Sequence, residues 1–155
     1  MNFLERIVTG FTARKIPYAL VGGYAVALHG APRGTVDIDI VVRHSEDFFK
    51  SVEQCMKDLG FSPRLPVTAK EIFHFKEEYI AKRNLIAWSF YNPTNPLEVL
   101  DVIITHDLSR MKSVTKKFGL GKINVLSIED LIKMKMDAGR PQDLEDVKVL
   151  KALQK

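Results

Sequence analysis

Two aspartates lie within a stretch of sequence that otherwise has the character of a buried strand. They are Asp37 and Asp39 in "RGTVDIDIVV", residues 33–42. The residues around them are apolar and β-branched, which is typical of a strand covered on both sides (Val36, Ile38, Ile40, Val41 and Val42). Residues at positions i and i+2 of a strand project from the same face. Burying a carboxylate costs free energy unless the group is paired or bound to a metal. This spacing therefore predicts that the two aspartates bind a cation between them.

A third carboxylate and a glycine pair extend this pattern. Asp101 lies in "LEVLDVII", a second strand-like stretch. Gly22 and Gly23 separate a short apolar stretch from a helical one, and glycines there would let the backbone approach an anion. Oxygen ligands beside an anion-binding turn are typical of metal-assisted phosphoryl chemistry. Taken singly, Asp101 could instead be a structural carboxylate paired with an Arg or Lys.

Hydrophobic periodicity predicts alternating helices and strands around one central sheet. Expected helices cover residues 1–15, 24–30, 45–60, 127–139 and 141–153, with Ser45 and Ser127 as N-caps. Expected strands cover residues 18–22, 36–42, 71–75, 84–91, 97–104 and 122–127. We therefore expect an α/β (α+β) fold, a mixed central sheet flanked by helices and followed by C-terminal helices. The chain of 155 residues fits a single domain over 1–155, with a core over 16–126 and a C-terminal helical segment over 127–155.

Composition narrows the classes of protein to consider. No apolar run is long enough to span a membrane, and the first residues do not resemble a signal peptide, so we expect a cytoplasmic protein without a membrane partner. The single cysteine, Cys55, falls on an apolar helix face and excludes an intrachain disulfide. The formal charge of +4 favours anionic partners. Trp88, Phe90 and Tyr91 are expected to pack in the core, although they could stack on a base.

Two blocks of sequence resemble the minimal nucleotidyltransferases of the polymerase-beta-like superfamily. The first, "VGGYAVALHGAPRGTVDIDIVV" (21–42), has their glycine pair, helix and Asp-x-Asp strand. The second, "DLIKMKMDAGRPQDLEDV" (130–147), is similar to a late segment of the bacterial branch that includes nucleotidyltransferase toxins and is related to antibiotic nucleotidyltransferases. This resemblance implies the nucleotidyltransferase fold for the whole chain.

The resemblance also implies the metal site and the catalytic residues. Asp37, Asp39 and Asp101 would ligate two Mg²⁺ ions, for which Mn²⁺ could substitute. Asp101 would also act as the base for the acceptor hydroxyl, or lie near it. All three are therefore expected to be both catalytic residues and metal ligands.

The implied nucleotide site surrounds the glycine pair. Gly22 and Gly23 would hold the triphosphate at the start of the helix. Many superfamily members have Ser at the second position, whereas Gly23 leaves only backbone donors. The remaining residues assigned to this site are Arg33, Thr35, Lys135 and Arg140. Arg140 and the acidic residues at 143–146 could equally be a capped helix start.

The expected function is Mg²⁺-dependent transfer of a nucleoside monophosphate from an NTP, most simply ATP, to an acceptor hydroxyl. The acceptor stays open among a small molecule, RNA and protein, with tRNA as one candidate, and an antitoxin partner or a homodimer is compatible with the resemblance. The alternative is a catalytically silent nucleotide-binding or toxin–antitoxin interaction module of the same fold. The basic cluster over 110–122 fits either a solvated surface or a site that attracts RNA.

Overall fold

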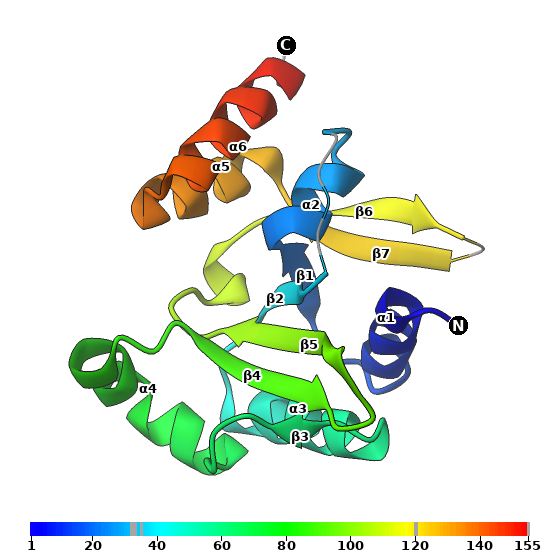
Figure 1. The fold of residues 1–155 in the computed structure, drawn as a ribbon, viewed down its shortest axis with the longest axis vertical. Helices are drawn as coiled ribbons and strands as arrows, with labels where there is room; N and C mark the ends of the chain where they lie inside the picture. Colours follow the sequence, from blue (N-terminus) through cyan, green and yellow to red (C-terminus); the bar gives the residue numbers. More distant parts are fainter. Residues whose placement is uncertain (32–33, 35, 120, 155) are drawn as a thin grey trace.

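A mixed seven-stranded sheet flanked by six helices forms the part of the chain that the computed structural model describes, residues 1–31, 34, 36–119 and 121–154 (Figure 1). The helices are α1 (Phe3–Ala13), α2 (Gly22–Leu28), α3 (Glu46–Asp58), α4 (Ala69–Arg83), α5 (Ile128–Ala138) and α6 (Pro141–Leu153). The strands are β1 (Tyr18–Val21), β2 (Ile38–Val42), β3 (Ser62–Pro63), β4 (Ala87–Asn92), β5 (Asn95–Ile103), β6 (Ser113–Phe118) and β7 (Gly121–Leu126). A short 3-10 helix, η1 (Leu108–Arg110), follows β5. The α/β fold class predicted from the sequence is confirmed.

The strand order places the aspartate-bearing strands beside each other. It runs β3-β4-β5-β2-β1-β7-β6, so β2 lies between β5 and β1. β2 is parallel to β5 and antiparallel to β1. In this register Asp39 is the direct partner of Asp101 on one side and of Val21 on the other. Residues far apart in the sequence therefore meet at the end of β1.

One face of the sheet is apolar, and the other, the polar face, carries Asp39 and Asp101 beside buried apolar residues such as Val41. Trp88, Val102 and Ile40 are register partners on one face, where the ring of Phe49 from α3 lies 5.7 Å from that of Trp88. Trp88 and Phe90 are buried in the core, as predicted, and Tyr91 is partly exposed. Because side chains alternate along a strand, Asp39 and Asp101 point to the opposite face.

The helix starts follow the predicted capping. The Ser45 side chain accepts a hydrogen bond from the Phe48 N–H, and Ser127 accepts one from the Asp130 N–H. These bonds satisfy backbone donors that have no partner within the helix. Cys55 of α3 is fully buried, as its position on the apolar face predicted.

The predicted strand over residues 71–75 is wrong, because these residues belong to α4. Thr68 caps this helix and forms a reciprocal capping box with Glu71. Ala69 and Ile72, three positions apart, provide its buried contacts. The aromatic and β-branched residues favoured a strand locally, but the cap and the helical spacing of the buried positions determine the structure.

Two boundaries near the aspartates also differ from the prediction. β2 begins at Ile38, and Val36 is 59% exposed, so Val36 is not part of a buried strand. Asp37 thus lies in a bend just before the strand. The glycine pair does not precede α2 but forms its first two residues.

The C-terminal helices form a separate layer on the sheet. α5 and α6 pack side by side beyond α2, at the end of the molecule opposite α3 and α4 (Figure 1). None of the helices in the described part of the chain is both long enough and apolar enough to cross a membrane.

Candidate active site

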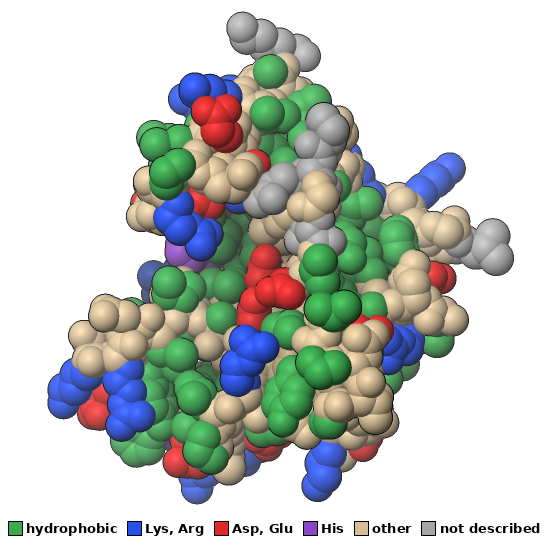
Figure 2. Space-filling model, viewed as in Figure 1, with side chains coloured by type: hydrophobic (Ala, Val, Ile, Leu, Met, Phe, Trp, Pro, Cys, Tyr) green, Lys and Arg blue, Asp and Glu red, His purple; other side chains and the backbone are tan. Residues whose placement is uncertain are grey.

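The three predicted carboxylates meet at one place on the polar face of the sheet. Asp39 and Asp101 are register partners on β2 and β5, and Asp37 lies two residues before Asp39. Figure 2 shows acidic side chains at the centre of this face, beside a hollow between the α5–α6 layer and the β4–β5 end of the sheet. The arrangement is therefore set by strand pairing, which holds the backbone of Asp39 and Asp101 rigidly.

Ser89 is a further polar residue of the cluster that sequence reasoning missed. It is the register partner of Asp101 across β4 and β5, and its hydroxyl donates a hydrogen bond of 2.5 Å to Asp101 Oδ1. This bond orients the Asp101 carboxylate, which also forms a hydrogen bond with the carboxyl group of Asp39. Only the register identifies Ser89, because nothing in its local sequence distinguishes it from other strand serines.

The start of α2 fits closely against the carboxylates. Gly22 has φ +66°, and a Cβ built on it would lie 2.9 Å from Asp39 Cγ and closer still to Oδ2. A side chain is thus excluded both by the backbone conformation and by the neighbouring carboxylate. Gly22 and Gly23 line a cavity of about 450 Å³ that also reaches Asp37 and Asp39.

Burial and neighbouring negative charge raise the pKa values of Asp37 and Asp39. The pKa of Asp39 rises to about 7, first because of burial and then because of the charge of Asp101 and a hydrogen bond between the two carboxyls. Burial and the charge of Asp101 also raise the pKa of Asp37, which Arg64 partly offsets. Such repulsion is what a bound cation relieves.

The donor set suits a divalent ion that completes its shell with substrate. Among the described residues, no three His, Cys, Asp or Glu side chains are arranged so that they could hold a metal ion by themselves. Mg²⁺ is commonly held by one or two carboxylates together with substrate phosphates, and such a site needs no protein cage. Asp37, Asp39 and Asp101 are oxygen donors of this kind, so the residues present fit the predicted ion.

Two cations from the C-terminal helices reach the same cavity. Lys135 of α5 and Arg140, which precedes α6, both line it, as their assignment to the nucleotide site requires. Lys135 is buried, with its Nζ 2.7 Å from Asp146 Oδ2 and 3.5 Å from Asp143 Oδ1. The sequence pattern did not reveal that this lysine is held by α6.

Arg140 serves as both a cap and a cavity residue. Its Nε donates a hydrogen bond of 2.7 Å to Asp143 Oδ2, and Asp143 in turn accepts from the Arg140 N–H. Burial by itself would raise the pKa of Asp143. The hydrogen bonds from Arg140 and the charge of Lys135 outweigh burial and hold this pKa below its ordinary value. The two interpretations left open for residues 140–146 are therefore compatible, because the helix cap also positions Arg140 beside the site.

Replacing Lys135 is expected to destabilise the fold. In Lys135→Met the buried carboxylates of Asp143 and Asp146 lose their shared cation, and breaking a buried ion pair in this way costs about 3 kcal/mol. Urea denaturation measures this loss. Lys133→Met is the matched control, because Lys133 is exposed and lies 3.9 Å from its partner Asp130. Equal unfolding midpoints for both variants would contradict the assignment.

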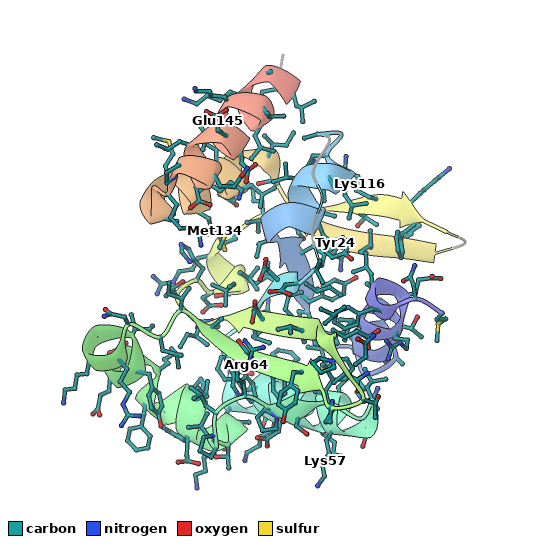
Figure 3. The ribbon with its side chains drawn as sticks, viewed as in Figure 1. Tyr24, Lys57, Arg64, Lys116, Met134 and Glu145 are labelled. Atoms are coloured by element: carbon teal, nitrogen blue, oxygen red, sulfur yellow. The ribbon has the colours of Figure 1, made fainter. Side chains whose placement is uncertain are left out.

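A larger cavity continues from the carboxylates along the C-terminal helices. Its volume is about 700 Å³, and it extends from Asp101 to His106 at the end of β5 and to Met134 on α5. Its walls are mostly apolar, which suits the non-reacting part of a substrate. Figure 3 labels Met134 and Arg64 on opposite sides of the site, with Arg64 lying over β4. Arg64, which interacts electrostatically with Asp37, was not predicted.

Arg33 and Thr35, the other two residues assigned to the nucleotide site, lie outside the described residues. Their roles stay predictions. The remaining seven predicted site residues, Gly22, Gly23, Asp37, Asp39, Asp101, Lys135 and Arg140, all line one or both of the cavities.

Comparison with known proteins identifies the family of this chain and shows which solved structures share its fold. Residues 2–154 match a family model described as "Nucleotidyl transferase AbiEii toxin, Type IV TA system". No match was found among the curated proteins.

Several solved structures share the fold. The antibiotic-resistance factor ANT(2'')-Ia has a TM-score of 0.67 at 14% identity, with 99% of this chain and 83% of that chain covered. The lincosamide antibiotic adenylyltransferase LnuA, solved with lincomycin bound, has a TM-score of 0.58 at 20% identity, with coverage of 97% and 96%. An antigenic nucleotidyltransferase-like protein from Paracoccidioides brasiliensis has a TM-score of 0.60 at 18% identity, with coverage of 95% and 72%. The nucleotidyltransferase fold predicted from the two sequence blocks is confirmed.

Proposed function

This chain belongs to the AbiEii nucleotidyl transferase toxin family, and we propose that it transfers a nucleoside monophosphate from an NTP to an acceptor hydroxyl. The observation that carries the proposal is the cluster of three carboxylates beside the Gly22 turn, in which the pKa of Asp39 rises to about 7. Such a cluster destabilises the free protein, and an anionic substrate bound together with a cation would compensate it.

The proposed reaction is an exchange of one phosphorus–oxygen bond for another. The acceptor oxygen forms a bond to the α-phosphorus, and the bond from that phosphorus to the bridging oxygen breaks. The bond's electron pair leaves with pyrophosphate, and the hydroxyl proton passes to a carboxylate. No covalent enzyme intermediate is required, so catalysis rests on positioning and electrostatics.

Asp101 is the residue we assign to proton acceptance. Its Oδ1 already accepts from Ser89, which fixes the carboxylate plane and directs Oδ2 away from that bond. Asp101 also borders the larger cavity, where an acceptor has room to approach. A general base must lie within hydrogen-bonding reach of the proton it removes, so the proposal requires the acceptor hydroxyl to bind in the larger cavity beside Asp101.

The phosphates are proposed to lie in the smaller cavity. The backbone of Gly22 and Gly23 forms one wall, and Lys135 and Arg140 form another. Cations placed there neutralise charge as it develops on the leaving pyrophosphate. Mg²⁺, held by Asp37, Asp39 and Asp101, would supply Lewis-acid polarisation of the phosphate, and Mn²⁺ could replace it.

The proposal extends to the donor nucleotide, the acceptor and the protein partners. We take ATP as the donor and leave the acceptor open among RNA, with tRNA as one candidate, protein and small molecules. The family comprises toxins of type IV toxin–antitoxin systems, and a cognate antitoxin is therefore a proposed partner. A second copy of the chain could complete the larger cavity; sedimentation of the protein alone would detect such a dimer.

Transfer of label from NTPs carrying a radioactive α-phosphate tests the proposal. Wild type and Asp37→Asn/Asp39→Asn would each be incubated with Mg²⁺ and bulk RNA, protein or an aminoglycoside panel. Label transferred by wild type alone supports the proposal and identifies the acceptor class. Equal labelling by the variant would overturn the catalytic assignment. Metal-dependent NTP binding without transfer to any fraction would favour the silent nucleotide-binding module.

A further inference from the structure

The segment that contains the β6–β7 hairpin carries positive charge that no acidic residue within the segment balances. Between Asp107 and Glu129 the chain contains no Asp or Glu, but it contains five cations (Arg110, Lys112, Lys116, Lys117 and Lys122). Among the described residues, none of these five side chains forms an ion pair with a carboxylate. The proposed transfer reaction uses none of them.

Two of these lysines face each other directly. Lys117 of β6 is the register partner of Lys122 of β7, and both are exposed. Like charges directly opposite each other on neighbouring strands destabilise the pair. Replacing either lysine would therefore make the hairpin more stable. An anionic partner that binds both lysines explains why the two occur together.

The strand register also determines which way this pair points. Leu20 of β1 pairs with Val125 of β7, whereas Val21 pairs with Asp39. Side chains alternate along a strand, so Lys122 and its partner Lys117 lie on the same side of the sheet as Asp39 and Asp101. β6 is the edge strand, and the hairpin extends away from the body of the molecule (Figure 1). A long ligand can therefore lie across it without obstruction.

We propose that the β6–β7 hairpin binds the phosphodiester backbone of a nucleic acid strand. The chemistry is that of ammonium groups on successive phosphates, which gives affinity without base sequence preference. A phosphodiester strand offers a separate phosphate to each of these two ammonium groups, whereas a single small anion offers one charge to both. This interaction surface is separate from the cavities, and it holds whether or not the bound strand is also the acceptor for transfer.

Lysines on an edge strand can also serve only to prevent edge-to-edge pairing of sheets. That role needs charge but not positive charge, so Glu would serve equally well. It also does not require two lysines directly opposite each other, as Lys117 and Lys122 are. Reversing the sign of the charge therefore separates the two roles.

The test is the binding of fluorescein-labelled poly(U) RNA, measured by anisotropy at several salt concentrations without NTP. We expect wild type to bind with a salt-dependent Kd. Lys117→Glu/Lys122→Glu should weaken binding by at least about tenfold and reduce the salt slope by about 1.4, because two phosphate contacts are lost from a single strand. Lys117→Arg/Lys122→Arg should bind as wild type does. The matched control is Lys70→Glu/Lys82→Glu on exposed positions of α4, which makes the same change in net charge and should have a much smaller effect.

A single substitution provides a second readout. Lys122→Glu turns the opposed lysines into an oppositely charged pair, so it should raise the Tm while it weakens RNA binding. The proposal is overturned if wild type does not bind RNA, if both double reversals weaken binding equally, or if the hairpin reversal affects binding only to phosphatidylserine vesicles. Because no outcome depends on nucleotide transfer, failure here leaves the proposed reaction untouched, and an inactive protein could still bind RNA.

Discussion

Asp39→Asn is expected to reduce nucleotide transfer by about a thousandfold or more and, in the same protein, to raise stability above about pH 7. Activity is lost because an amide holds a divalent cation poorly between the sheet and the phosphates. Stability rises because the pKa of Asp39 is raised from 3.8 to about 7 by burial and by Asp101. The folded protein thus keeps a proton that the unfolded chain has already released.

The sign of the pH dependence follows from this difference. The stabilising contribution of protonated Asp39 is complete below about pH 4 and is lost as the pH rises through about 7. The amide that replaces this carboxyl group cannot ionise, so the variant lacks this loss, which amounts to a few kcal/mol. We expect similar Tm values for both proteins at about pH 4, where the contribution is still complete, and a higher Tm for the variant at about pH 8.

Thermal unfolding in the presence of a chelator checks this prediction. Asp58→Asn is a control of opposite sign, because hydrogen bonds from Arg14 and Gln54 lower the pKa of Asp58. Replacing Asp58 removes stability that is present at neutral pH and lost in acid. If wild type and Asp39→Asn gave parallel profiles of Tm against pH, the pKa of Asp39 would not be raised in the folded protein, and the prediction would be wrong.

Gly22→Ala is expected to be the second most damaging single substitution. Its φ of +66° disfavours any L side chain, and the new Cβ would overlap Asp39 Oδ2. Because the three atoms nearest the new Cβ all belong to the Asp39 side chain, either this carboxylate must turn away from the site or α2 and β2 must move apart. We expect a loss of about 3 kcal/mol or more in the free energy of unfolding, together with loss of Mg²⁺-dependent ATP binding.

Gly60→Ala separates the two causes. Gly60 also has positive φ, +87°, but a Cβ there would have nothing within 4 Å. This variant should lose only the backbone contribution, about 1 kcal/mol, and should bind ATP normally. Urea denaturation and ATP titration measure both effects. If the two variants behaved alike, the close approach of Gly22 to Asp39 would have no energetic consequence.

Several features were predictable because they depend on local physics. Ser45 and Ser127 begin helices since their side chains satisfy backbone donors within the next turn. The β-branched apolar residues around Asp39 predicted a buried strand, and β2 confirms this. The two quoted blocks also carried the resemblance to nucleotidyltransferases, which the family match confirms.

Local sequence patterns predicted the wrong secondary structure where a helix cap or contacts distant in sequence determine it. Residues 71–75 have strand-like composition, yet the capping box at Thr68 and the packing of α4 make them helical. Residues 113–118, rich in lysine and without a clear apolar alternation, were not recognised as β6, because its structure depends on pairing with β7. Intrinsic preference is a weak guide when the partner strand supplies the stabilising contacts.

The sequence by itself determined the chemical groups and their local order: the Gly22 turn, Asp37 and Asp39 two residues apart, and a third carboxylate in a later strand. Only the tertiary structure decided that Asp101 faces Asp39, that Ser89 orients Asp101, and that Asp143 and Asp146 hold Lys135 beside the cavity. The physical reason is that strand register and helix packing are set by the burial of many apolar residues at once, which no single stretch of sequence encodes.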